Sequence, residues 1–358
     1  MKIGRNLTEL AMEVDRQRES KRDFLAATDH ITMEQMGNEL RLGDDMILGI
    51  KPLAHDQLAA YTGIPTPYYK RMQKDEPELL MNNVNRWLHR EPEKRMIRTL
   101  DGNARAFLSD KFRPLDNDAL LEAALPPLME MGVDIMSCEV TDSRLYLKVV
   151  DARIKNDVPT GRMMGDGSHI FFDTVSPALV LSNSEVGHGA LRVETAVWTH
   201  LCTNLAVVSQ RSTRKYHVGA RADIGEEVYA LLSDQTRLLT DAALWGQVRD
   251  VVKAAFDQAQ FDAVCQTLGD ASKEMITADP VKVIEITAKR FQMTQGEQSS
   301  VLRHLITGGS LTKYGLHAAV TRAAEDLVDY DRASHFEALG GKIIELPKNE
   351  WRQLAEAA

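Results

Sequence analysis

Apolar side chains recur every three or four positions in the first part of the chain, a spacing typical of amphipathic helices. The first 50 residues predict one such helix and a loosely patterned strand. A helix over 53–61 is followed by Gly63, and Pro65 and Pro67 open the next helix. Glycine after a helix and proline at the start of the next are the usual punctuation. The pair predicts a helical hairpin packed on the core, with a helix-turn-helix as the alternative.

The pattern changes to short strands after residue 92. Asp101-Gly102 separates two apolar runs and is a strong hairpin signal. A capped helix, ALLEAALPPLMEM, comes next, and VDIMSCEV and RLYLKVV predict a second hairpin. Beyond a glycine-rich loop, the segments HIFFDTV, ALVLSNSEV and ALRVETAVW predict further strands. HLCTNLAVV fits either a helix or a strand, and a helix that follows the sheet is favoured.

Helical periodicity returns at Glu226 and continues almost to the end, with breaks at Asp279-Pro280 and Gly308-Gly309. The last segment, GGKIIELPKNEWRQLAE, predicts a short strand and a terminal helix. The fold class is therefore expected to be α+β: a central, mostly antiparallel sheet with hairpins and a crossing helix, followed by a helical C-terminal region. The expected divisions are an N-terminal helical region (1–92), an α+β core with basic strands (93–222) and a helical C-terminal region (223–358).

Composition favours a cytoplasmic protein. The chain has 358 residues, of which 44% are hydrophobic, and no run approaches the roughly 18 apolar residues of a membrane span. The first residues are charged throughout, unlike a signal peptide. The three cysteines, Cys138, Cys202 and Cys265, are odd in number and widely spaced. They fit reduced thiols better than a disulfide framework.

Charge is distributed unevenly along the chain. The net charge is −9, and the segment from Asp223 to Ala358 carries 21 acidic and 14 basic residues. By contrast, the segment 192–222 has five basic residues against one acidic, and 90–115 has seven against four. The middle of the chain is therefore locally basic and its last third acidic.

No catalytic signature stands out, so no enzyme activity, cofactor or metal is expected. There is no phosphate-binding loop, dinucleotide fingerprint or nucleophile elbow, and GDGSH at 165–169 is interpreted as a plain loop. Two weaker alternatives remain. A zinc site would need the set His188, His200, Cys202 and His217, and a metal-dependent nuclease would need Asp166, Asp173 and Glu185. Glu185, in SNSEVG, is better explained as a hydrogen-bond acceptor in a turn.

Two basic stretches interleaved with aromatic residues predict a nucleic-acid interface, since arginine and lysine neutralise phosphates and aromatic rings stack on unpaired bases. Each stretch taken alone also fits a solvated face with core phenylalanines. The candidate residues are Arg95, Arg98, Arg105, Phe107, Lys111 and Arg113 in the first stretch, and Arg211, Arg214, Lys215, Tyr216, His217 and Arg221 in the second.

Several segments resemble the phage/plasmid-like protein family of unknown function, among them RAFLSDKFRPLDN, LVLSNSEVGHGALRVETAVWTHLCTN and LTKYGLHAAVTRAAEDLVDYDRASHFEALGGKIIEL. The resemblance extends over nearly the whole chain. Family members commonly have a glycine after Cys-Thr-Asn and an arginine before it, and this chain has neither. The resemblance implies a mobile-element setting and no established catalytic residues. By coarse analogy of topology, it also suggests the single-strand annealing recombinases of phages.

The leading hypothesis is thus a phage- or mobile-element-encoded protein that binds or anneals single-stranded DNA in recombination or replication, without hydrolysing nucleotides. Its expected partners are single-stranded DNA, further copies of itself in a ring or filament, and a host protein recruited by the acidic C-terminal region. No membrane is expected to be involved. The alternatives are a modulator that inhibits a host defence or replication enzyme through its acidic surface, and the metal-dependent nuclease.

Overall fold

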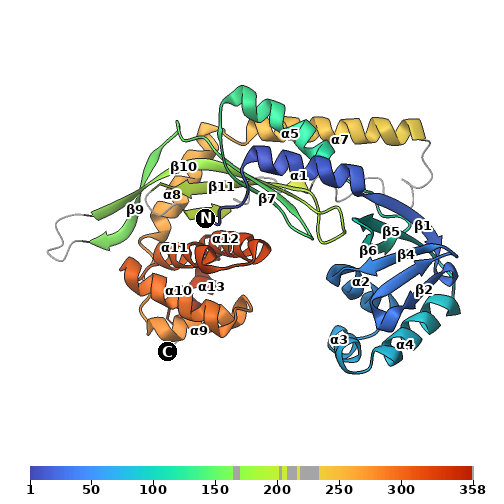
Figure 1. The fold of residues 1–358 in the computed structure, drawn as a ribbon. Coiled ribbons are helices and arrows are strands. Elements are labelled where there is room, and N and C mark those ends of the chain that lie inside the picture. The colour runs from blue at the N-terminus through green and yellow to red at the C-terminus, as the bar shows by residue number, and fades with distance from the viewer. Residues whose placement is uncertain (164–169, 201–203, 208–215, 218–233, 357–358) are drawn as a thin grey trace.

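The computed structural model describes residues 1–163, 170–200, 204–207, 216–217 and 234–356 (Figure 1). The α+β class predicted from the sequence is confirmed, as is the helical C-terminal region. The described strands form two separate sheets, however, where one central sheet was expected. Residues 1–92, expected to be helical, also contribute four strands to the first sheet.

The first sheet has six strands in the order β1-β5-β6-β4-β3-β2, and its only parallel pair among the described strands is β4 with β6. The hairpin predicted at Asp101-Gly102 joins β5 to β6, and both residues have a positive φ there. The strands are β1 (Arg22–Ala27), β2 (Ile31–Glu34), β3 (Glu39–Leu42), β4 (Met46–Ile50), β5 (Lys94–Leu100) and β6 (Asn103–Ser109).

Three helices cover one face of this sheet: α2 (Pro52–Thr62), α3 (Thr66–Asp75) and α4 (Pro77–Arg90). Gly63 caps α2 in the left-handed conformation, as the sequence predicted. The apolar sides of the three helices pack on the strands in one core that includes Leu58, Tyr69 and Leu80. The predicted helical hairpin therefore does pack on the core. We call the six-stranded sheet and these helices the N-terminal lobe.

The second sheet is antiparallel throughout its described strands, in the order β12-β11-β10-β8-β7. The strand β9 pairs only with the first half of β10, so these two strands extend beyond the sheet as a long hairpin (Figure 1). The strands are β7 (Asp134–Val140), β8 (Leu145–Val150), β9 (Asn156–Met163), β10 (Ile170–Asn183), β11 (Arg192–Thr199), β12 (Asn204–Val207) and β13 (Tyr216–His217).

Helices cover both faces of the second sheet. On one face lie α1 (Leu7–Ser20), α5 (Asn117–Met131) and α7 (Asp234–Ala254), above the sheet in Figure 1. On the other lies a bundle whose helices α8 and α12 contact the sheet. The bundle comprises α8 (Gln258–Ala271), α9 (Pro280–Arg290), α10 (Gln295–Gly308), α11 (Lys313–Ala323), α12 (Tyr330–Ile344) and α13 (Lys348–Ala355).

Two favoured local predictions were wrong, and for the first of them the strand alternative is correct. The described part of HLCTNLAVV is the strand β12, which pairs antiparallel with β11 at the sheet edge and buries Leu205. The expected strand in GGKIIEL belongs to α12 instead. Gly340 permits this helix to approach α11 closely, because a Cβ there would lie 2.2 Å from Cγ2 of Thr321.

None of the helices in the described ranges is long and apolar enough to span a membrane.

Candidate functional site

Two of the arginines predicted on the first hairpin, Arg98 and Arg105, point into the protein. Arg98 is 1% exposed; its guanidinium contacts Asp23 and Asp116 at 2.8 Å and donates to the Glu185 carbonyl oxygen. Arg105 is also buried and donates to the Glu185 carboxylate at 2.7 Å. These cations are thus neutralised inside the fold and face no groove in this structure.

The other predicted residues of this hairpin are placed differently from one another. Phe107 is buried in the core of the N-terminal lobe. Arg95 lies over the Tyr61 ring, 4.2 Å from its centroid, and pairs with Glu93. Lys111 is exposed and Arg113 is partly buried. The first stretch therefore does not form one continuous basic strand on the surface.

Most of the second basic stretch lies outside the described residues, namely Arg211, Arg214, Lys215 and Arg221. Tyr216 and His217 form β13, where they pair with Val193 and Arg192 of β11. The prediction that this stretch contacts nucleic acid stays a prediction.

Glu185 is the centre of a charged network between the N-terminal lobe and the second sheet. Its carboxylate accepts hydrogen bonds from Arg105 and from the Asn117 backbone, as the turn-acceptor interpretation anticipated. The Lys21 ammonium contacts Glu185 at 3.3 Å. It also contacts Asp116 and Asp118, each at 3.0 Å.

This network includes the only set of three potential metal ligands found in the described ranges: Asp116, Asp118 and Glu185. The Lys21 ammonium lies among them and supplies the positive charge. Burial alone would raise the pKa of Asp116, but Arg98 and Lys21 together lower it below its usual value. Burial alone would likewise lower the pKa of Lys21, and Glu185 and Asp116 raise it instead. The cluster is thus a closed ion network that joins two parts of the fold.

The described residues of the two metal alternatives do not come together as a set of ligands. Asp173 and Asn183 lie ten residues apart on the extended strand β10, roughly 33 Å, which keeps Asp173 far from Glu185. His200 hydrogen-bonds Ser176 at 2.7 Å and packs on the Trp198 ring. Asp166 and Cys202 lie outside the described residues.

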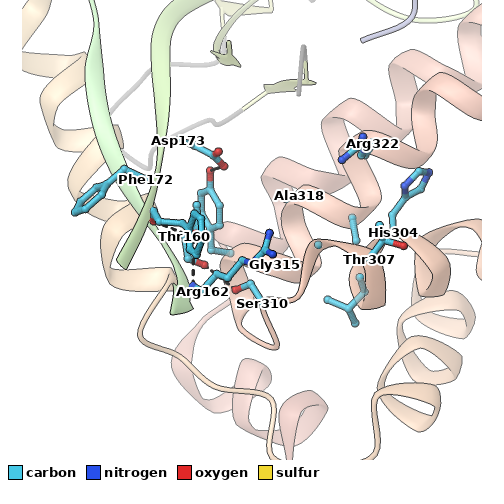
Figure 2. Close-up of a pocket in the computed structure, with 15 residues that line it drawn as sticks. Thr160, Arg162, Phe172, Asp173, His304, Thr307, Ser310, Gly315, Ala318 and Arg322 are labelled. Carbon is cyan, nitrogen blue, oxygen red and sulfur yellow. Dashed lines mark hydrogen bonds between the residues drawn. The ribbon is translucent and has the colours of Figure 1, made fainter. Parts of the chain in front are cut away.

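A pocket of about 340 Å³ lies where the β9–β10 hairpin meets α10 and α11. Figure 2 shows Arg162 reaching in from the hairpin, and His304 and Arg322 on the helices across from it, whereas the Phe172 ring points away from those helices. This volume falls within the range typical of small-molecule sites.

Exposed aromatic side chains distinguish this hairpin from the rest of the sheet. Ile170, Phe171 and Phe172 are 48%, 39% and 55% exposed. The Arg162 guanidinium lies over the Phe171 ring, 4.7 Å from its centroid, in a cation–π contact. Three consecutive exposed apolar residues beside an arginine are costly in water and are typical of a binding surface.

Tight contacts hold the base of the hairpin on the helical bundle. The Tyr314 hydroxyl donates to Asp173 at 2.7 Å, and the Ser310 hydroxyl donates to the Thr160 carbonyl at 2.7 Å. Gly161 has a φ of +76°, and a Cβ there would lie 2.5 Å from the Ser272 carbonyl oxygen. Only glycine fits this position without displacing the strand. The pocket is therefore anchored on rigid elements while the aromatic side chains stay accessible.

The sequence contains a signal for this site beyond the strand pattern. Ile170, Phe171 and Phe172 follow one another without a polar residue between them, so an alternating strand must expose at least one of them unless both its faces are covered. The segment was predicted only as a strand, because nothing in the sequence indicated that it lies beyond the second sheet.

No family model, curated protein or solved structure matches this chain.

Proposed function

We propose that the protein binds single-stranded nucleic acid, with the β9–β10 hairpin and the pocket at its base as the contact surface. The observation that carries the proposal is that Phe171 and Phe172 are both exposed and that Arg162 is stacked on Phe171. Stacking on aromatic rings combined with cationic contacts to phosphates is how proteins hold unpaired strands without reading sequence.

The pocket adds contacts for one nucleotide unit. Thr160, Thr307 and Ser310 bring hydroxyl groups to its lining, and Arg322 brings a guanidinium from α11. A base stacked at Phe171, beside Arg162, would place its sugar and phosphate within reach of these groups. The surface is selective for single strands because a base inside a duplex does not expose its face.

The wider setting is part of the same proposal. The resemblance to the phage/plasmid-like family supports an annealing-type role, without hydrolysis, in the cytoplasm of a host cell. Assembly of several copies along the strand is also proposed. Electron microscopy with and without single-stranded DNA tests it, since a ring or filament supports assembly and isolated particles in both samples contradict it.

Fluorescence anisotropy with a labelled oligothymidine tests the binding itself. Phe172→Ala should weaken binding by about 5- to 150-fold, because one stacked base contributes about 1–3 kcal/mol. Arg162→Gln should weaken binding and flatten its dependence on salt, since one phosphate contact is removed.

Matched controls come from exposed residues elsewhere in the chain. Tyr68→Ala removes a 48% exposed aromatic from α3, and Arg18→Gln removes an exposed arginine from α1. Both controls should bind as the wild type does. The proposal fails if the wild type shows no salt-sensitive binding at micromolar concentrations, or if the hairpin variants and the controls bind equally well.

A further inference from the structure

A second pocket, of about 500 Å³, lies between the second sheet and α12, and shares no lining residue with the hairpin pocket. Its sheet side is formed by residues of β8, β10, β11 and β12, among them Tyr146, Ser182 and Arg192. Its helix side includes Ser334 and Glu337 of α12. The lining is strongly polar, unlike the apolar contacts that join α12 to the neighbouring strands.

Several charged groups of this pocket already have partners within the protein. Glu337 holds the buried ammonium of Lys148 at 2.7 Å. Asp331 accepts hydrogen bonds from Thr141 and Ser143. Arg332 forms an ion pair with Glu297 at 2.7 Å. The acidic groups named here are therefore largely satisfied by the fold itself.

Two donors of the pocket are buried and lack any partner among the described residues: Nε of Arg192 and the hydroxyl of Ser334. A buried donor without an acceptor costs about 1–3 kcal/mol, so native proteins rarely keep one without a reason. Here two such donors, from β11 and α12, line the same pocket.

Further positive charge lies around these donors. The Arg144 guanidinium lines the pocket and donates to the His188 carbonyl oxygen. Gly189 makes room for it, because a Cβ at that position would collide with the guanidinium. Lys342 contributes an exposed ammonium at the far end of α12. Glu194, two residues from Arg192 on the same face of β11, is an acceptor for a ligand hydroxyl or amine.

We infer that this pocket binds a small molecule that carries a phosphate or carboxylate group, with Arg192 and Ser334 donating to the oxyanion. Unfilled donors beside the Arg144 and Arg192 guanidinium groups call for an acceptor-rich, negatively charged ligand. The inference is independent of the proposed nucleic-acid binding, because it rests on other residues and another pocket.

Thermal unfolding of the full-length protein provides the test, with inorganic phosphate and succinate as probes and sodium chloride at matched ionic strength as the reference. A ligand that binds the folded state raises the Tm in a saturable way. We expect phosphate or succinate to raise the Tm beyond the chloride reference, and the stronger of the two identifies the class of oxyanion. Equal Tm values in all three solutions would overturn the inference.

Two variants locate the effect. Arg192→Gln should weaken the affinity for the more stabilising probe by about tenfold or more in a calorimetric titration, because it removes charge-assisted hydrogen bonds. Ser334→Ala is the safer variant for folding, since it removes a buried hydroxyl that has no partner. It should keep or raise the Tm of the free protein and reduce the shift caused by the probe.

The control Arg290→Gln removes an arginine that pairs with Glu350 outside this pocket and should leave the probe's affinity unchanged. Unchanged affinity in both Arg192→Gln and Ser334→Ala would contradict the assignment of the site. Oligothymidine binding measured on the same two variants should match the wild type, and this separates the pocket from the hairpin surface.

Discussion

Nη2 of Arg105 donates to Oε2 of Glu185 at 2.7 Å, and both side chains are buried although 80 residues separate them in the sequence. This contact joins β6 of the N-terminal lobe to the turn that follows β10 of the second sheet. It also explains why the basic hairpin does not line a surface groove. Arg98 and Arg105 balance carboxylates at the junction of the two sheets.

Removal of the Glu185 charge should destabilise the whole protein. Glu185→Gln leaves Arg105 and Lys21 without their shared carboxylate, and breaking a buried ion pair typically costs about 3–5 kcal/mol. Urea denaturation measures the free energy of unfolding. Asp15→Asn, which breaks an exposed pair with Arg18, should cost less than about 1 kcal/mol. Similar losses in both variants would show that the network is not a structural junction.

The Lys21 ammonium should offset the electrostatic repulsion among the three neighbouring carboxylates. In Lys21→Ala, Asp116, Asp118 and Glu185 would remain close together without that cation. We expect this variant to be destabilised in EDTA and to regain part of its Tm with magnesium or calcium ions, which bind carboxylate oxygens. The wild type should show no such dependence. Equal responses of the two proteins to divalent ions would refute this role of Lys21.

Two buried histidines should make stability depend on pH. Burial lowers the pKa of both His55 and His317 to about 4, from a usual value of 6.5. The unfolded chain therefore takes up these protons at higher pH than the folded one. The contribution of the two neutral histidines to the free energy of unfolding is complete above about pH 6.5. It is lost as the pH falls toward 4, by up to about 1.4 kcal/mol per pH unit for each histidine.

Urea denaturation between pH 4 and pH 7 measures this slope. His317→Gln should flatten it, because glutamine does not titrate, even if the variant is less stable at pH 7. His30→Gln serves as the control, since His30 is exposed and its removal should leave the slope unchanged. A slope that is the same in all three proteins would contradict the assignment.

Lys148 and Glu337 form an ion pair in which neither side chain is more than 1% exposed. Burial lowers the pKa of Lys148, although Glu337 opposes this effect. Lys148→Met should cost about 3–5 kcal/mol, because it leaves the carboxylate buried without its cation. The double variant Lys148→Met with Glu337→Leu should recover much of that loss. If the free-energy costs of the two single substitutions simply add in the double variant, the pair is not energetically coupled.

Patterns that depend on local chemistry were predictable from the sequence. Asp101-Gly102 gave the β5–β6 hairpin, Gly63 gave the end of α2, and Asp279-Pro280 gave the start of α9. Each of these features is decided by a few adjacent residues and their backbone preferences.

Features that depend on distant partners were not predictable in the same way. The segment GGKIIEL fits a strand by its sequence, and only the close approach of Gly340 to Thr321 explains it as a position where two helices meet. Arg98 and Arg105 fit an exposed interface by their sequence, because the carboxylates of Asp23 and Glu185 lie far away along the chain. The hairpin site was missed because periodicity does not tell which end of a long strand extends beyond its sheet.

Photocrosslinking followed by mass spectrometry tests the central claim most directly. Single-stranded oligonucleotides carrying 5-iododeoxyuridine crosslink to aromatic residues on which the base stacks. We expect the crosslinked peptide to contain Phe171 and Phe172, with the yield lost in Phe172→Ala and retained in Tyr68→Ala. Crosslinks confined to other peptides, or none above the level of a non-binding control protein, would contradict it.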